Sequence, residues 1–196
     1  MTVRKVFDKA YYDQFYMEPS TRAVAPDEFH RLSQFVCAAL RYFDQPVKRV
    51  LDLGCGLGYW QGVIEQEFPR ASYTGVEISD FMCETYGWRK GSAVDFRSRW
   101  PFDLVICNDV LQYLDDNDAE TAVDNLGSLC RGALYFGALT QQDWRENCDQ
   151  NRTDGKGYLR TGSWYRQRLA RQFITIGGGL YASQRSDIVL YELEHL

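Results

Sequence analysis

Gly54, Gly56 and Gly58 alternate with other residues directly after a short apolar run, and Asp52 stands two positions before the first of them. Glycines between a strand and a helix let the backbone turn tightly and approach a ligand that no Cβ would admit. A bare turn would not justify three of them, since each costs up to roughly 1 kcal/mol of backbone entropy. An acid at this place suits a ligand with an ammonium group better than one with a pyrophosphate. We therefore expect a ligand to lie against residues 52–58.

The dinucleotide-binding fingerprint G-x-G-x-x-G is incomplete in this turn. A motif opened by Gly54 and Gly56 needs its third glycine at position 59, which is Tyr59. A motif opened by Gly56 and Gly58 needs it at position 61, which is Gln61. Dehydrogenase activity is therefore disfavoured.

Further polar residues follow the next predicted strands. Glu77 ends the second strand, where a carboxylate can accept both hydroxyls of an adenosine ribose. Asp95 ends the third and can accept from an adenine amino group, with Phe96 against the ring, and Asn108 and Asp109 end the fourth. Taken singly, Glu77 and Asp95 could equally be helix N-caps or solvated strand ends. Together they lie at the sheet edge where open α/β sheets bind ligands.

The elements that must position these residues alternate between helix and strand. Apolar spacing predicts helices over residues 26–42, 59–68, 80–86 and 118–129, and strands over residues 49–53, 72–77, 92–96, 102–108 and 133–138. Two last extended runs, residues 173–176 and 188–193, should form an antiparallel hairpin around Gly177, Gly178 and Gly179. The pattern predicts an α/β fold: a doubly wound, mostly parallel seven-stranded sheet in an α-β-α sandwich, closed by a C-terminal antiparallel hairpin.

From about residue 49 onward the sequence resembles the class I S-adenosylmethionine-dependent methyltransferases of the small-molecule type. The likeness rests on the D-x-G-x-G-x-G turn, the acids after the second and third strands, and a fourth strand that reads FDLVICNDVLQYL. Some of these enzymes carry a histidine where Tyr113 stands here, so nothing is inferred from that histidine. The resemblance implies S-adenosylmethionine as cofactor, S-adenosylhomocysteine as product, and the following cofactor-binding residues: Asp52, Gly54, Cys55, Gly56, Gly58, Glu77, Ile78, Asp95, Phe96, Asn108 and Asp109.

The methyl acceptor has fewer signals. We expect one domain over residues 1–196: an N-terminal helical lid (1–45), a cofactor-binding core (46–140), and an acceptor-side segment with the closing hairpin (141–196). Candidate acceptor-binding residues are Tyr12, Tyr16, Gln112, Tyr113, Trp144 and Arg152, with Arg22 as a further lid candidate, and candidate catalytic residues are Tyr16, Asp149 and Arg152. The N-terminal aromatic segment could equally be an amphipathic helix packed beside the sheet. Arginines of the acceptor-side segment could be ordinary surface ion pairs.

Composition excludes several classes of function. A net charge of −5 argues against nucleic-acid binding as the main activity. The six cysteines are widely spaced and only two histidines are present, so we expect no metal site. No long apolar window or secretory leader is recognisable, so we expect a cytoplasmic protein with no membrane partner. The expected activity is methyl transfer to a small molecule; a protein methyltransferase and a non-catalytic cofactor-binding regulator or partner subunit are the alternatives, and the oligomeric state stays open.

Overall fold

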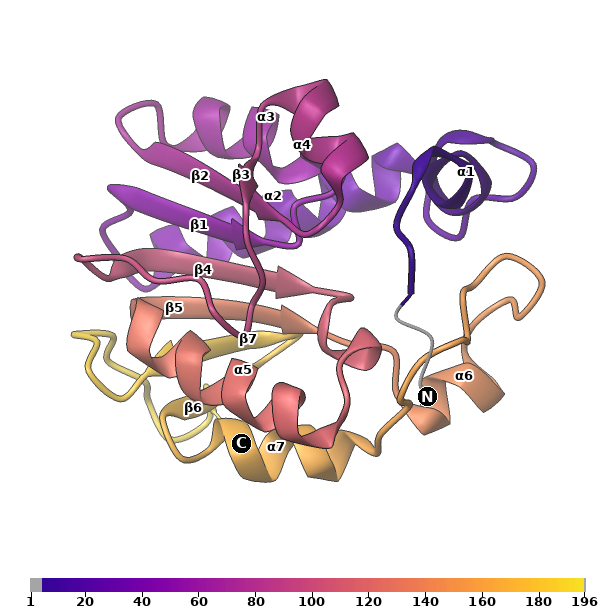
Figure 1. Cartoon of the computed structure of the whole chain (residues 1–196). Helices are drawn as coiled ribbons and strands as arrows, with labels where there is room; N and C mark the ends of the chain where they lie inside the picture. The colour runs from indigo at the N-terminus through magenta and orange to yellow at the C-terminus, as the bar shows by residue number, and fades with distance from the viewer. Residues whose placement is uncertain (1–4, 196) are drawn as a thin grey trace.

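The computed structural model describes residues 5–195, and its centre is a seven-stranded sheet in the order β3-β2-β1-β4-β5-β7-β6 (Figure 1). The strands are β1 Arg49–Leu53, β2 Ser72–Glu77, β3 Arg89–Lys90, β4 Phe102–Asn108, β5 Cys130–Gly137, β6 Phe173–Gly177 and β7 Leu180–Ser183. The first five run parallel, whereas β7 runs antiparallel to both β5 and β6. This confirms the predicted doubly wound sheet with a closing hairpin.

Helices cover both faces of the sheet. On one face, α2 (Pro26–Tyr42) and α3 (Tyr59–Glu67) pack on a cluster that includes Val50; on the other, α5 (Asp116–Leu129) and α7 (Gly162–Leu169) pack on one that includes Leu51. Adjacent residues of a strand point to opposite faces, which is why β1 serves both cores. The remaining elements are α1 (Lys9–Tyr12), a π-helical turn η1 (Asp13–Met17), α4 (Asp80–Tyr86), a 3-10 turn η2 (Leu111–Tyr113) and α6 (Gln141–Glu146).

Helix α2 has the predicted bounds, and its start is well explained. Pro26 occupies the first position, where its missing N–H costs nothing, and the Glu28 side chain accepts a hydrogen bond from the Ala25 backbone N–H at 2.8 Å. The helix packs on the sheet through Val36 and Leu40. The predicted lid was therefore too long: α2 belongs to the sandwich.

The third strand was placed wrongly. Residues 89–90 form β3, and residues 92–96 form a turn. The side chain of Asp95 accepts from the Ser92 backbone N–H, and the Ser92 hydroxyl accepts from the Val94 backbone N–H. Such local side-chain bonds offer the backbone an alternative to a strand.

The second strand of the hairpin was also placed wrongly. Residues 180–183 form β7, directly after Gly177, Gly178 and Gly179, which all have positive φ angles and close a tight connection. Residues 188–193 lie outside any strand, and Val189, Tyr191 and Leu193 are exposed. Apolar residues in this run suggested a strand, but β7 already fills the position between β5 and β6.

The N-terminal segment lies beyond the carboxyl ends of the parallel strands. Figure 1 shows α1 at the end of the molecule toward which the arrowheads of β4 and β5 point, with α6 at the same end. Tyr11 and Tyr12 are buried there, in a cluster with Met82 of α4. We call residues 5–17 the lid, because they lie over the sheet edge where the predicted site residues gather.

Candidate active site

A cavity of about 1210 Å³ lies between the sheet edge and the lid. It runs from the glycine turn after β1, past the ends of β2 and β4, to residues 156–158 of the acceptor-side segment. The structure brings the following predicted residues to its wall: Tyr12, Tyr16, Asp52, Gly54, Cys55, Gly56, Glu77, Ile78, Asp95, Asn108, Asp109 and Tyr113. Cofactor candidates and acceptor candidates therefore share one cavity.

The three glycines of the turn serve different purposes. A Cβ on Gly54 would stand 2.4 Å from a methyl carbon of Val110, and one on Gly58 would stand 2.5 Å from the Trp88 ring. Both residues also have positive φ angles, so packing and backbone conformation require glycine there. Gly58 does not line the cavity. Of the three, Gly56 has the most open surroundings, since the nearest atom to its Cβ position is a Tyr12 ring carbon at 3.8 Å.

Glu77 is held in place by backbone N–H groups. Its side chain is 4% exposed; Oε2 accepts from Gly56 N at 2.9 Å, and Oε1 accepts from Ile78 N and Ser79 N at 2.7 and 2.9 Å. Burial and the nearby charge of Glu77 raise the pKa of Tyr12, which faces this carboxylate from the lid. Glu77 therefore links the glycine turn, the start of α4 and the lid at one point of the cavity.

Asp52 is a buried acid on the cavity wall. It is 2% exposed, and Oδ2 accepts a hydrogen bond from the Tyr73 hydroxyl at 2.5 Å. Burial raises its pKa to about 7, against the lowering effect of the Tyr73 bond. Within residues 5–195 no ion pair involves Asp52. A cationic group of a ligand would satisfy this carboxylate.

Asp95 and Phe96 separate in the structure. Asp95 lies in the turn after β3 and reaches the cavity wall. Phe96 is 7% exposed and packs in the core beneath α5, so it does not line the cavity. The predicted contact of Phe96 with an adenine ring has no support in this arrangement.

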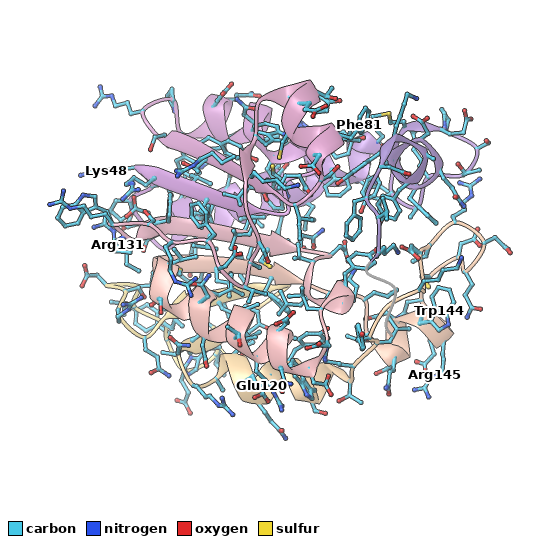
Figure 2. The ribbon with its side chains drawn as sticks, in the orientation of Figure 1. Lys48, Phe81, Glu120, Arg131, Trp144 and Arg145 are labelled. Atoms are coloured by element: carbon cyan, nitrogen blue, oxygen red, sulfur yellow. The ribbon has the colours of Figure 1, made fainter. Side chains whose placement is uncertain are left out.

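The lid covers the cavity with aromatic side chains. Tyr11 hydrogen-bonds Tyr113 of η2 through the two hydroxyls at 2.9 Å, and Phe7 meets both rings edge to face at about 5 Å. Tyr12 packs on Phe81 of α4, which Figure 2 shows between the sheet and the lid. Phe7 and Tyr11 were not singled out in the sequence, although their aromatic neighbourhood was.

The acceptor-side segment reaches the cavity by other residues than those predicted. Trp144 packs on Gly155, and Figure 2 shows it on α6. Arg152 and Asp149 face each other at 3.7 Å, with about half of each side chain exposed. Neither they nor Trp144 line the cavity, whereas Lys156, Gly157 and Tyr158 do. The predicted catalytic roles of Asp149 and Arg152 have no geometric support.

A lysine of the lid also faces the cavity. Lys5 forms an ion pair with the buried Asp154 and stands 4.4 Å from the centre of the Tyr113 ring. Burial and the charge of Lys156 lower its pKa to about 8. Sequence inspection missed this residue, since a lone lysine near the start of a chain carries no signal of burial.

Two further findings concern metal ions and membrane-spanning helices. Among the described residues, no group of three or more His, Cys, Asp or Glu side chains is arranged to hold a metal ion. Over residues 5–195, no helix combines the length and apolarity that a membrane crossing requires.

Comparison with known proteins agrees with the geometry. Residues 51–132 match the family model described as a methyltransferase domain. The malonyl-[acyl-carrier protein] O-methyltransferase of Anoxybacillus flavithermus is 28% identical over 154 residues, 74% of this chain and 58% of the relative. The trans-aconitate 2-methyltransferase of Deinococcus radiodurans is 29% identical over 103 residues, 47% of this chain and 40% of the relative. The chain thus spans about half the length of these relatives.

A solved structure shares the fold at low identity. The amino pentose methyltransferase CalS10 of Micromonospora echinaspora, solved with bound S-adenosylmethionine, superposes with a TM-score of 0.59. It is 16% identical in sequence, and the match covers 81% of this chain and 92% of that one. At this identity the likeness shows the fold alone, and that fold is the expected one.

Proposed function

We propose that this chain, which has the fold and the domain of the class I S-adenosylmethionine-dependent methyltransferases, transfers a methyl group from S-adenosylmethionine to a small molecule. The cavity carries the proposal: one continuous space of about 1210 Å³ joins the glycine turn to the aromatic lid. Small-molecule pockets usually measure about 300–1,000 Å³, so this one has room for the cofactor and a small acceptor together.

The cofactor-side residues match the polar groups of S-adenosylmethionine. Asp52, buried and without a cationic partner among the described residues, would take the ammonium of the methionyl end. Glu77, fixed by backbone N–H groups, would accept the ribose hydroxyls, and Asp95 would accept from the adenine amino group. When bound, the cofactor supplies an electrophilic methyl group on a sulfonium.

The chain then has to orient the acceptor and exclude water. Proximity and orientation alone are worth up to about 7–11 kcal/mol in favourable cases. The lid rings of Phe7, Tyr11 and Tyr16, with Tyr113 and Tyr158, line the part of the cavity that we assign to the acceptor. This aromatic lining favours a small acceptor over a folded protein.

Calorimetric titration with S-adenosylmethionine, S-adenosylhomocysteine and NAD tests the cofactor. We expect the first two to bind and NAD not to bind. Glu77→Gln and Glu77→Ala should weaken S-adenosylhomocysteine binding by about 10- to 150-fold, because a charge-assisted hydrogen bond contributes roughly 1.5–3 kcal/mol. Glu84→Ala, an exposed acid of α4, is the matched control and should bind normally.

Thermal unfolding of each variant shows whether the Glu77 substitutions disturb folding. If Glu77→Gln is folded and binds as tightly as the unchanged protein, Glu77 is not in the cofactor site. If neither S-adenosyl compound binds, the proposed function itself is wrong.

A further inference from the structure

Asp109 is held in an unusual backbone conformation at the end of β4. Its φ angle is +57°, and the only other non-glycine residue with a positive φ among the described residues is Asp44. This conformation costs an L-residue on the order of 1 kcal/mol, so the surrounding structure has to fix it. The Asp109 N–H donates to the Gly137 carbonyl oxygen of β5 at 2.9 Å, and this hydrogen bond holds the Asp109 backbone in place. The strained residue lies on the cavity wall.

Two side-chain amides aim the Asp109 carboxylate. Asn108 Nδ2 donates to Oδ2 at 2.9 Å, and Gln112 Nε2 donates to Oδ1 at 3.2 Å. Gln112 is 3% exposed, and its own Oε1 has no hydrogen-bond partner among the described residues. The Asn108 side chain has room beside β5 because residue 137 is glycine: a Cβ there would stand 2.1 Å from Asn108 Oδ1. Burying an amide with one end unsatisfied is costly, so orienting this carboxylate is its evident purpose.

Among residues 5–195, no cationic side chain forms an ion pair with Asp109. The titratable groups that influence it or are influenced by it are four phenols, one thiol and one carboxyl group: Tyr16, Tyr113, Tyr135, Tyr165, Cys107 and Asp143. Burial, with Asp143 adding to it, raises its pKa above the ordinary range of a carboxyl group. The site thus holds a carboxylate that binds a proton more readily than usual.

We propose that Asp109 is the general base of the methyl transfer and that the acceptor is a hydroxyl or amine compound whose reacting atom carries a proton. The inference rests on the proposed function. In the step, the acceptor oxygen or nitrogen forms a bond to the methyl carbon while the carbon–sulfur bond breaks and its electron pair stays on sulfur. The acceptor proton passes to the Asp109 carboxylate, which later releases it to solvent.

Charge balance supports this assignment. A sulfonium and a carboxylate disappear together, since the first becomes a neutral thioether and the second a neutral acid. In a water-poor cavity such neutralisation favours the transition state, because electrostatic interactions there are stronger than in water. A carboxylate acceptor would need no base. It would also bring a second negative charge beside Asp109.

The first test needs no acceptor. Thermal unfolding of the unchanged protein, Asp109→Asn and Asp149→Asn is followed from pH 4 to pH 8. Asp109→Asn should gain stability relative to the unchanged protein as the pH rises, because the buried carboxyl group of Asp109 is costly to ionise and the asparagine amide does not ionise. Asp149→Asn, an exposed aspartate outside the cavity, should show no such trend.

The second test measures methyl transfer from labelled S-adenosylmethionine to phenols, primary amines, and mono- and dicarboxylates. Hydroxyl or amine compounds should be methylated. Asp109→Asn should lower kcat by about 100-fold or more, the usual contribution of a general base, and should change the KM for the acceptor much less. With a phenol that is already ionised at pH 8, such as 4-nitrophenol, the kcat of Asp109→Asn should fall far less, because this acceptor has no proton to transfer.

The outcomes separate this inference from the proposed function. If S-adenosylhomocysteine does not bind, the proposed function fails. If S-adenosylhomocysteine binds and carboxylates are methylated while no hydroxyl or amine compound is, the inference about Asp109 is overturned and the proposed function stands. An equal loss of kcat for ionised and neutral phenols, or a stability difference that does not vary with pH, would also overturn it.

Discussion

At the scale of single residues, the site combines groups that are costly for the fold and useful to a ligand. Asp52 is the clearest case, since it is buried and, in the part of the chain that the structure describes, its side chain accepts one hydrogen bond, from the Tyr73 hydroxyl. A ligand ammonium would turn this cost into binding energy. Natural active sites often trade stability for function in this way.

Asp52→Asn should therefore stabilise the protein without ligand while weakening cofactor binding. The ordinary pKa of an aspartate, about 3.9 in the unfolded chain, lies below the native value of about 7. Between these values the native state holds a proton that the unfolded state has released, so stability falls as the pH rises from 4 to 7. The asparagine variant does not titrate, and its advantage in Tm should grow over this range and level off above it.

Thermal unfolding in a pH series checks this, with binding of S-adenosylhomocysteine at pH 8 as the second readout. Tyr73→Phe is the informative control, because it removes the donor and leaves the acid, so it should raise the pKa of Asp52 further. A Tm difference for Asp52→Asn that is the same at pH 4 and pH 8 would contradict the prediction.

Sequence inspection located the glycine turn and its acids but not the reason for each residue. Gly58 is required by the Trp88 ring, which packs against it and donates to the Gly56 carbonyl oxygen at 2.9 Å. Trp88 is 30 residues away in the chain, so no local pattern links the two. The cavity residues Lys5, Lys156 and Tyr158 were missed for the same reason: tertiary contacts place them, not spacing.

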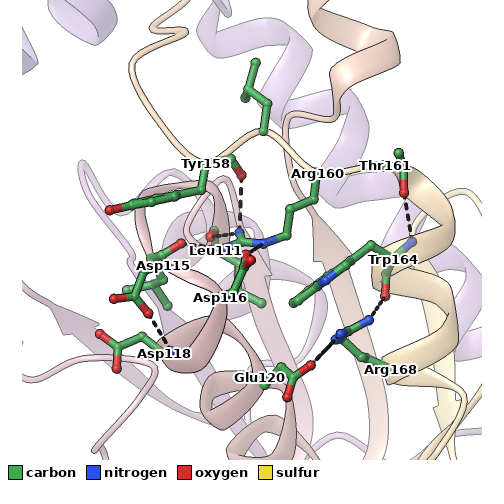
Figure 3. Close-up of polar contacts among 12 residues, drawn as sticks. Leu111, Asp115, Asp116, Asp118, Glu120, Tyr158, Arg160, Thr161, Trp164 and Arg168 are labelled. Carbon is green, nitrogen blue, oxygen red and sulfur yellow. Dashed lines mark hydrogen bonds and ion pairs between the residues drawn. The ribbon is translucent and has the colours of Figure 1, made fainter.

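At the scale of elements, Arg160 joins the acceptor-side segment to the rest of the site. Figure 3 shows its guanidinium between Leu111, Asp116 and Trp164. It is 5% exposed and donates to the carbonyl oxygens of Leu111 and Leu114 at 2.9 and 2.6 Å, and to Asp116 at 2.9 Å. The residue therefore fixes η2, the turn that carries Gln112 and Tyr113.

Arg160→Met should lower the free energy of unfolding by about 3–5 kcal/mol, because it leaves buried carbonyl oxygens without donors. The free energy of unfolding of Arg160→Lys should lie between those of Arg160→Met and the unchanged protein, since an ammonium cannot make all the hydrogen bonds of the planar guanidinium. Arg168→Met is the matched control: Arg168 pairs with Glu120 near the surface, and its loss should cost at most about 1 kcal/mol. Denaturant unfolding measures all three, and equal losses for Arg160→Met and Arg168→Met would contradict this role.

Periodicity predicted the elements that have one buried face and failed where local chemistry or topology decided. α2 and β4 were predicted with the observed bounds because their apolar patterns are long. Residues 92–96 were predicted as a strand but form a turn, because the side chains of Ser92 and Asp95 hydrogen-bond to the local backbone. The run at 188–193 looked like a strand, but a strand needs a partner, and the sheet order leaves it none between β5 and β6.

At the scale of the whole molecule, the lid is attached at three separate places. The Ser79 hydroxyl donates to the Phe7 carbonyl oxygen at 2.5 Å, the Tyr11 and Tyr113 hydroxyls bond each other, and Lys5 pairs with Asp154. These attachments join the lid to α4, to η2 and to the acceptor-side segment, and so to both ends of the cavity. We expect a bound molecule to leave faster when one of these attachments is broken.

The ion pair of Lys5 and Asp154 should therefore set how fast ligands leave. Lys5→Met and Asp154→Asn should each raise the dissociation rate of S-adenosylhomocysteine by roughly 10-fold, which corresponds to about 1.4 kcal/mol in the barrier. The double variant should be no faster than the single ones, because both remove the same interaction. Stopped-flow displacement measures these rates.

Lys9→Met is the control for the loss of a lid lysine, since Lys9 pairs with Asp13 within the lid itself. It should leave the dissociation rate unchanged, because breaking a pair inside the lid frees no attachment to the rest of the molecule. Additive effects of Lys5→Met and Asp154→Asn would show that the two residues act separately. In that case the aromatic contacts of the lid with η2, rather than this ion pair, would hold the cavity closed.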